Sequence, residues 1–227
     1  KSIDTRQGVV GISTSYPRNE FDTEFSKEVA YFRGTGTLVD RNFVLTANHV
    51  VSQVEKNNVA FTDGYNDNDA INIFSSPYFD IAMLKLGNSV PERFPSIKLA
   101  SKKIDWMEPG YTIGHSGYRW RLNGGWQISS LIGLGTDKGD LMTMGVSGSG
   151  NSGGGFFDIE GRIAGVLWGS SSRWGGGGAV VQTPKDYQDP HATDYWPTAD
   201  QNSTSAGTDY SIIKEFVSKY TIHDGDG

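Results

Sequence analysis

The stretch 146-VSGSGNSGGGFFD-158 is the part of the chain from which the expected fold and function follow. It holds five glycines in thirteen residues, a density typical of places where the backbone bends sharply or approaches another group closely. Ser152 lies near its centre, between Asn151 and Gly153. Taken alone, the stretch fits either a rigid loop that displays a nucleophilic serine or a flexible glycine-serine hairpin. Residues elsewhere in the chain have to decide between the two.

The segments on both sides of this stretch predict a β protein. Short runs rich in β-branched and aromatic residues are bounded by turn residues, as is typical of strands. Many short strands at modest spacing indicate a sandwich or a barrel. The predicted strands lie within residues 36–47, 80–86, 111–117, 126–135, 162–169 and 178–184.

The end of the chain departs from this pattern. Asp209 is a good helix N-cap, and the apolar residues that follow it recur on one helical face. We therefore expect a terminal helix that packs on the body of the protein through Ile212, Ile213, Phe216, Val217 and Tyr220. Residues 185–207 contain many turn formers and predict a long surface loop before this helix.

Length and composition exclude several classes of protein. The 227 residues fit one large domain or two small ones that share an interface. The net charge of −6 arises from 26 acidic and 20 basic residues, without the basic stripe of a nucleic-acid-binding protein. The chain has no cysteine, which excludes disulfides and thiolate zinc sites. No apolar run approaches the ~18 residues of a membrane-spanning helix, so we expect no membrane span. From the charge distribution, we expect no nucleic-acid partner.

A nucleophilic serine needs a base to take its proton, a carboxylate to orient that base, and N–H donors for the oxyanion. His49 follows the strand-like run 43–48, whereas the other histidines lie in a glycine turn, a proline-rich loop and the chain end. Asp80 leads directly into an apolar strand, where a partly desolvated carboxylate needs a partner. Alone, His49 is equally well a packed or capping histidine, and Asp80 a turn residue. The backbone amides of Gly150 and Ser152 are candidates for the oxyanion hole.

Four segments then resemble the chymotrypsin-like (trypsin-like) serine peptidase family. The segments 46-TANHV-50, 80-DIAML-84 and 150-GNSGG-154 are similar to its three signature blocks and follow its order of His, Asp and Ser. A fourth, 165-GVLWG-169, resembles the strand that lines the substrate cleft. The resemblance covers residues 34–181. The compact spacing and the absence of cysteine are similar to the bacterial branch that includes the glutamyl endopeptidases.

This resemblance implies an all-β fold of two six-stranded antiparallel β-barrels with the active site between them and a C-terminal helix. The first barrel would lie within residues 1–100 and carry His49 and Asp80. The second would lie within residues 101–227 and carry Ser152, the specificity pocket and the helix, so that both form one peptidase domain. His49 would act as base and then acid, Asp80 would orient it, and Ser152 would form the acyl-enzyme. The amides of Gly150 and Ser152 would bind the oxyanion.

The same resemblance suggests which residues bind the substrate. Val146 falls at the pocket base, where trypsin-like members have an aspartate, so a basic side chain would lack its counter-charge. An apolar residue before the scissile bond is therefore favoured. A preference for glutamate is the alternative. Glutamyl-specific relatives have a hydroxyl residue and a histidine in the pocket, and here Ser147 would supply the hydroxyl while His115 falls near the pocket rim. The complete set of expected substrate-binding residues is Val146, Ser147, Val166, Trp168, Gly169 and Gly178.

Two positions depart from the pattern of the digestive members. Asn151 replaces the aspartate that pairs there with a newly formed N-terminal ammonium. A neutral amide cannot form that ion pair, so we expect an oxyanion loop that is set up without it. Leu167 stands where a serine donates a hydrogen bond to the catalytic aspartate, which leaves Asp80 with one donor fewer.

Cofactors, partners and location are expectations from the same reasoning. No cofactor or metal is required, although the acidic cluster between Asp63 and Asp69 leaves calcium open beside the simpler interpretation as a solvated turn. The resemblance implies protein or peptide substrates and a secreted, extracellular monomer from a bacterium, with cell-surface attachment through regions outside this chain as an option. The alternative is a catalytically silent, peptidase-like binding or adhesion module.

Overall fold

The fold is described from a computed structural model. The residues it describes are 4–14, 29–31, 34–51, 56–61, 65–76, 79–114, 119–121, 127–137, 140–147, 152–169, 180–181 and 201–221.

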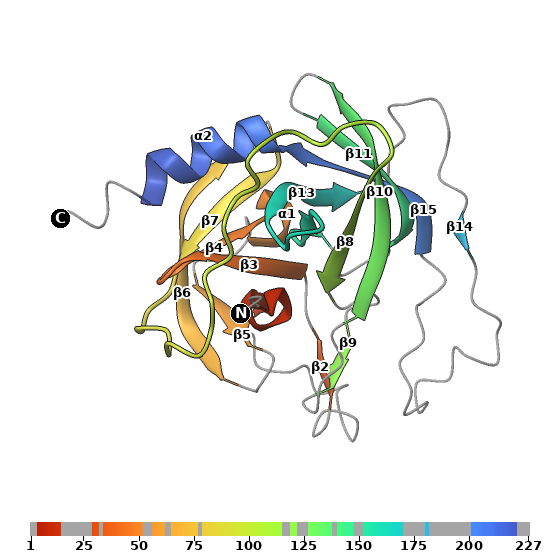
Figure 1. The fold of residues 1–227 in the computed structure, drawn as a ribbon. Helices are drawn as coiled ribbons and strands as arrows, with labels where there is room; N and C mark the ends of the chain where they lie inside the picture. The colour runs from red at the N-terminus through yellow and green to blue at the C-terminus, as the bar shows by residue number, and fades with distance from the viewer. Residues whose placement is uncertain are drawn as a thin grey trace.

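Six antiparallel strands from the first part of the chain close into a barrel (Figure 1). In barrel order they are β1 (Val9–Thr14), β3 (Gly34–Asp40), β4 (Phe43–Thr46), β7 (Ile81–Lys85), β6 (Asn66–Ser76) and β5 (Lys56–Ala60). Strands β4 and β7 are apolar along almost their whole length because both of their faces are covered. Val44 and Leu84 belong to one buried cluster, and Leu45 and Met83 to another.

The second part of the chain forms a seven-stranded antiparallel sheet in the order β11-β10-β8-β12-β13-β15-β14. Strand β11 pairs with β10 and also with β15, so the pairing of the first six strands returns to its start. The all-β architecture of two barrel-like units is therefore confirmed. The strands are β8 (Glu108–Gly114), β10 (Gln127–Asp137), β11 (Asp140–Ser147), β12 (Gly155–Phe157), β13 (Ile163–Gly169), β14 (Val180–Val181) and β15 (Gln201–Asp209).

The predicted terminal helix is confirmed as α2 (Tyr210–Thr221), which begins directly after Asp209. Ile213, Phe216 and Val217 are buried on its inner face. The Phe216 ring lies 5.0 Å from that of Phe74 in β6. Since α2 continues from β15 of the second sheet, it ties that sheet to the first barrel, as Figure 1 shows.

Short elements complete the described fold. A 3-10 turn, η1 (Thr5–Gly8), precedes β1, and a single helical turn, α1 (Asn48–Val51), follows β4. Strands β2 (Val29–Tyr31) and β9 (Arg119–Arg121) form a separate two-stranded ribbon that the sequence did not predict.

The prediction of a surface loop over residues 185–207 was wrong for its last part. Residues 201–207 belong to β15, which pairs with β11 on one side and β13 on the other. Its sequence, 201-QNSTSAGTD-209, has no apolar alternation, and the strand forms because two neighbouring strands supply its hydrogen-bond partners. Residues 185–200 lie outside the described part of the chain.

Residues 86–107 connect the two units and also hydrogen-bond to both. The backbone N–H of Ile97 donates to the carbonyl of Leu38 in β3 at 2.7 Å, and that of Ile163 in β13 donates to Lys98 at 2.9 Å. Side chains from both units share one buried cluster, which includes Leu45 and Phe157. The junction between the units is therefore a packed core. The expected domain boundary at residue 100 falls inside this connection and stays a prediction.

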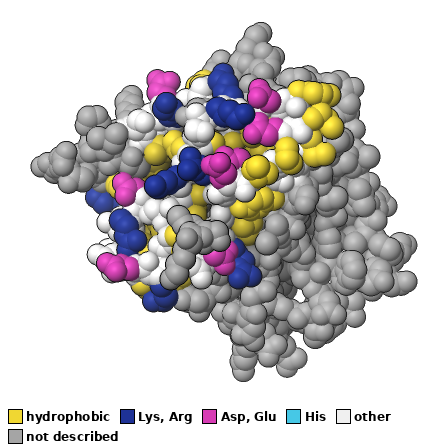
Figure 2. Space-filling model, viewed as in Figure 1, with side chains coloured by type: hydrophobic (Ala, Val, Ile, Leu, Met, Phe, Trp, Pro, Cys, Tyr) yellow, Lys and Arg dark blue, Asp and Glu magenta, His cyan; other side chains and the backbone are white. Residues whose placement is uncertain are grey.

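Charged side chains of both signs are interspersed over the described part of the face drawn in Figure 2. Exposed ion pairs such as Lys102–Asp105, 3.7 Å apart, contribute at most about 1 kcal/mol each. Among the described residues, no helix has both the length and the apolar character that crossing a membrane requires. The absence of a nucleic-acid partner stays a prediction.

Candidate active site

The pairing of β4 with β7 brings His49 and Asp80 together. Thr46, the last residue of β4, lies opposite Ala82 in the register of the two strands. In an antiparallel pair, residues that follow one strand face residues that precede the other. His49, in the turn α1 just after β4, therefore meets Asp80, which comes just before β7. The pairing of β4 with β7 thus brings together two residues that are 31 positions apart in the sequence.

Both carboxylate oxygens of Asp80 bind His49. Its Oδ2 lies 2.7 Å from Nδ1 of the imidazole, and its Oδ1 accepts the backbone N–H of His49 at 2.9 Å. The backbone contact fixes the carboxylate, which in turn fixes the plane of the ring. With the proton on Nδ1, the ring has its lone pair on Nε2, as a general base requires. The His49 side chain is 47% exposed and that of Asp80 is 24% exposed, so the base is accessible.

Asp80 adopts the left-handed backbone conformation, with φ of 52°. Aspartate tolerates this region better than most residues, but it is still an uncommon conformation. Such conformations persist where surrounding contacts enforce them, and they are frequent at functional sites. Here, the two hydrogen bonds to His49 and the start of the buried strand β7 hold the residue in place.

Ser152 is placed by hydrogen bonds to both units. Its carbonyl oxygen accepts the backbone N–H of Thr35 in β3 at 2.9 Å. The next residue, Gly153, donates its N–H to the carbonyl of Leu167 in β13 at 2.7 Å, and Leu167 donates back to Gly154 at 2.9 Å. The serine is half-buried. Residues 152–154 therefore form a fixed turn between the two units, which favours the rigid loop over the flexible hairpin.

Two glycines allow this close approach. Gly153 has φ of 86°, and a Cβ on it would overlap with the carbonyl oxygen of Thr35 and with Oγ1 of Thr46. A Cβ on Gly34 would lie 2.6 Å from Cγ2 of Val50 and 2.7 Å from the carbonyl oxygen of Ser152. Gly34 therefore lies between the side chain of Val50, which follows His49, and the carbonyl oxygen of Ser152, with no room for a side chain of its own.

We expect Gly153→Ala to destabilise the protein by about 2–4 kcal/mol, the sum of a strained φ and an overpacked contact. The overlap is with backbone and with a short buried side chain, neither of which yields easily. Urea denaturation followed by fluorescence measures the loss. Gly169→Ala is the matched control, because a Cβ there meets nothing within 4 Å. Equal unfolding free energies for the two variants would contradict the tight packing of Gly153.

The other expected site residues divide into three groups. Gly150, Asn151, Gly178 and His115 lie outside the described residues. Val146 and Ser147 end β11, and Ser147 pairs with Asn202 of β15. Val166, Trp168 and Gly169 are on β13, next to the turn that holds Ser152. Their roles in substrate binding stay predictions.

The residues on β13 differ in what they present. Val166 is 1% exposed and packs in the buried cluster shared by the two units. It acts on neighbouring residues through packing, since its side chain does not reach the surface. Trp168 is half-buried against the core of the first barrel. Gly169 faces open space. Leu167 is buried in the core of the second sheet with Leu131. Its apolar side chain offers no hydrogen bond to Asp80.

The structure adds residues that sequence reasoning missed. The hydroxyl of Thr46 donates to the carbonyl oxygen of Thr35 at 2.8 Å, fully buried, beside Gly153. Thr46 belongs to the 46-TANHV-50 segment, yet no periodicity or composition indicates which carbonyl its hydroxyl meets. That contact depends on how β3 and β4 are registered.

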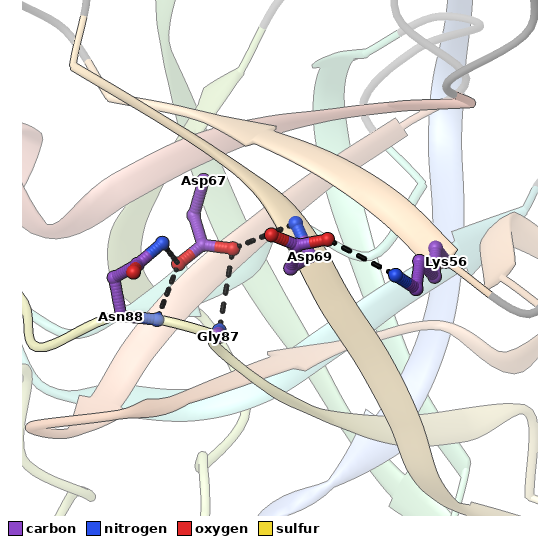
Figure 3. Close-up of polar contacts among 5 residues, drawn as sticks. All are labelled: Lys56, Asp67, Asp69, Gly87 and Asn88. Atoms are coloured by element: carbon purple, nitrogen blue, oxygen red, sulfur yellow. Dashed lines mark hydrogen bonds and ion pairs between the residues drawn. The ribbon is translucent and has the colours of Figure 1, made fainter.

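The acidic cluster at residues 63–69 was considered above as a calcium site. Its described residues make contacts within the protein (Figure 3). The carboxylate of Asp67, 1% exposed, accepts N–H groups from Asp69, Gly87 and Asn88 at 2.9–3.3 Å. Asp69 lies 3.1 Å from Nζ of Lys56. Among the described residues, no group of three or more acidic or histidine side chains is placed to hold a metal. A calcium ion at residues 63–69, of which Asp63 is not described, would compete with these donors.

Comparison with known proteins places this geometry in context. The sequence matches the family model described as a trypsin-like peptidase domain over residues 34–166. None of the curated proteins matches it significantly. The fold is similar to that of the serine endoprotease from Yersinia pestis, with a TM-score of 0.65 and 19% identity over 97% of this chain and 64% of that chain. The chain thus spans less than two thirds of that protein.

Two further solved structures share the fold. The active form of the Rv3671c protease from M. tuberculosis has a TM-score of 0.62 and 19% identity, over 95% of this chain and 81% of that chain. Its inactive form has a TM-score of 0.62 and 16% identity, over 95% and 89% of the two chains. At these identities, the likenesses show a common fold.

Proposed function

The chain belongs to the trypsin-like peptidase family, a family of serine endopeptidases, and we propose that it hydrolyses peptide bonds through His49, Asp80 and Ser152. The observation that carries the proposal is the double contact of Asp80 with His49, at 2.7 Å to the ring and 2.9 Å to the backbone. A histidine held only for packing needs no carboxylate on Nδ1. The proposed third member, Ser152, is supported by its fixed turn, whose carbonyl oxygen lies across Gly34 from Val50, the residue after His49.

Each residue has one task in the proposed reaction. Ser152 Oγ attacks the substrate carbonyl while its proton passes to Nε2 of His49, and the carbonyl oxygen becomes an oxyanion. The backbone N–H groups of Gly150 and Ser152 are proposed to bind that oxyanion. The protonated His49, held on Asp80, then gives the proton to the leaving amine. The C–N bond breaks, and the acyl group stays on Ser152 Oγ. Water then attacks this acyl carbonyl while His49 takes its proton, and His49 returns the proton to Ser152 Oγ as the acid product leaves.

The substrate and setting are the finer part of the proposal. An apolar side chain before the scissile bond is favoured by Val146 at the expected pocket base, and glutamate is the alternative, through Ser147 and His115. A secreted, extracellular bacterial enzyme that acts as a monomer is supported by the resemblance to the cysteine-free branch of the family. The reaction needs no metal or organic cofactor, because the nucleophile, the base and the oxyanion donors all belong to the chain.

A diverse peptide library, digested and read by mass spectrometry, tests this function. We expect cleavage after apolar residues by the wild-type chain, and a rate lower by about 10⁵-fold or more in His49→Ala, because loss of the base disables the whole triad. Cleavage restricted to glutamate would overturn the apolar preference and keep the peptidase. An untouched library with folded wild-type protein would contradict the peptidase and favour the silent binding module.

A further inference from the structure

We propose that Thr46 is a positioning residue of the active site, which sets the nucleophile of one unit against the His–Asp pair of the other. This inference rests on the proposed peptidase function. Thr46 is fully buried, so it does not touch the reacting atoms. It acts through Thr35 and Gly153, which hold the peptide of Ser152.

The hydroxyl of Thr46 replaces a backbone contact at the end of a strand pair. The ladder between β3 and β4 stops at Thr37 opposite Leu45. Beyond this point the side chain of Thr46 takes over and donates to the carbonyl oxygen of Thr35 at 2.8 Å. Thr46 and Thr35 are both fully buried, where a hydrogen bond is not weakened by competing water. The position of Thr35 relative to β4 therefore depends on this hydroxyl.

Thr35 in turn fixes the position of the peptide that carries the nucleophile. Its N–H donates to the carbonyl oxygen of Ser152 at 2.9 Å. The residue after the nucleophile, Gly153, rests against both the carbonyl of Thr35 and the hydroxyl of Thr46, with no room for a Cβ. Thr35 and Thr46 thus form the surface on which the turn of Ser152 sits. A displacement of either one shifts the serine.

Thr46 also lies near the other two members of the triad, one along its own strand and one through strand pairing. It comes three residues before His49. It is also paired with Ala82, the second residue after Asp80. One buried side chain therefore lies where the strand that leads to the base, the strand that follows the carboxylate, and the turn of the nucleophile all meet. This convergence is what separates Thr46 from the other buried threonines.

Replacing Thr46 with valine keeps the branched shape and removes only the donor. The carbonyl of Thr35 loses that donor, and β3 and the Ser152 turn are free to shift relative to His49. We expect kcat to fall by about 10- to 100-fold, the size of effect seen when reacting groups are displaced by around 1 Å. KM should change little, because a fully buried residue cannot contact substrate.

Two companion variants make the test specific. Thr46→Ser retains the hydroxyl, and we expect it to restore kcat to within about threefold of wild type if a hydrogen bond of ordinary strength is regained. Thr37→Val is the matched control, since Thr37 lies on the same strand as Thr35, is 2% exposed, and its hydroxyl has no partner among the described residues. This control should leave kcat unchanged.

The experiment measures kcat and KM of the four proteins on one peptide cleaved by the wild type, per mole of folded chain at 25 °C. A low kcat in Thr46→Val, recovery in Thr46→Ser and a normal Thr37→Val would support the positioning role. A normal kcat in Thr46→Val, or equal losses in Thr46→Val and Thr37→Val, would overturn it. Failure of the proposed function is distinct, because the wild type itself would then cleave nothing. If Thr46→Val does not fold, Thr46→Ala with Thr46→Ser gives the same comparison.

Discussion

Replacing Ser152 with alanine is expected to lower peptide hydrolysis by about 10⁵- to 10⁶-fold, because the attacking oxygen is removed and the rest of the triad is useless without it. The fold should be retained. The contacts that hold this turn are made by the backbone carbonyl of Ser152 and by Gly153, so alanine preserves them. We expect the unfolding free energy to change by no more than about 0.5 kcal/mol.

Steady-state cleavage of a library-derived peptide and urea denaturation measure the two parts of this prediction. Ser101→Ala is the matched control, since Ser101 is an exposed serine in the connection between the units. It should retain full activity. If Ser152→Ala cleaved the peptide as fast as Ser101→Ala, the assignment of the nucleophile would be wrong.

Asp80→Asn is expected to reduce kcat by about 10⁴-fold with little change in the fold. Both oxygens of Asp80 serve His49, one at the backbone N–H and one at Nδ1. Asparagine offers a single oxygen. If that oxygen accepts the backbone N–H, the amide NH₂ faces Nδ1 and forces the ring proton onto Nε2. The imidazole is then the wrong tautomer to accept the proton of Ser152.

The control for this variant is Asp69→Asn, which also removes one carboxylate from the first barrel. The Asp69 side chain is 60% exposed and pairs only with Lys56 among the contacts of its carboxylate in the described residues. We expect it to keep the wild-type kcat. A kcat for Asp80→Asn within tenfold of that for Asp69→Asn would show that the orientation of His49 does not depend on the carboxylate.

Strand β7 of the first barrel and the terminal helix could be predicted from the sequence, because their patterns are strong and local. The run 80-DIAMLKL-86 contains β7, which is buried on both faces, and its apolar residues show this directly. In α2, the spacing of Ile213, Phe216 and Val217 matches one helical face, and all three are buried. The helix begins at Tyr210, directly after Asp209, the residue that the sequence predicts as its N-cap.

Strand β15 could not be predicted, because nothing in its own residues requires a strand. Its neighbours β11 and β13 provide the pairing, and they are distant in sequence. The same limit applies within the site. The order of His49, Asp80 and Ser152 was visible in the sequence, whereas the double contact of Asp80 depends on the register of β4 with β7.

The packing of Gly153 shows why the glycine stretch was ambiguous at first. Dense glycine is compatible with flexibility and with close packing. Here, Gly153 packs against Thr35 and Thr46 so closely that any side chain would overlap. At this point, the absence of a side chain allows close packing. The turn that results is fixed by hydrogen bonds to both units.

The central claim is that Ser152 is activated for nucleophilic attack by His49 and Asp80. Reaction with an organophosphonate that phosphonylates only activated serines, read by intact-mass and peptide mass spectrometry at neutral pH, tests it most directly. We predict one adduct per chain, located on Ser152 and absent from Ser152→Ala. An adduct on a different residue, or no adduct on a preparation that cleaves peptides, would contradict the claim.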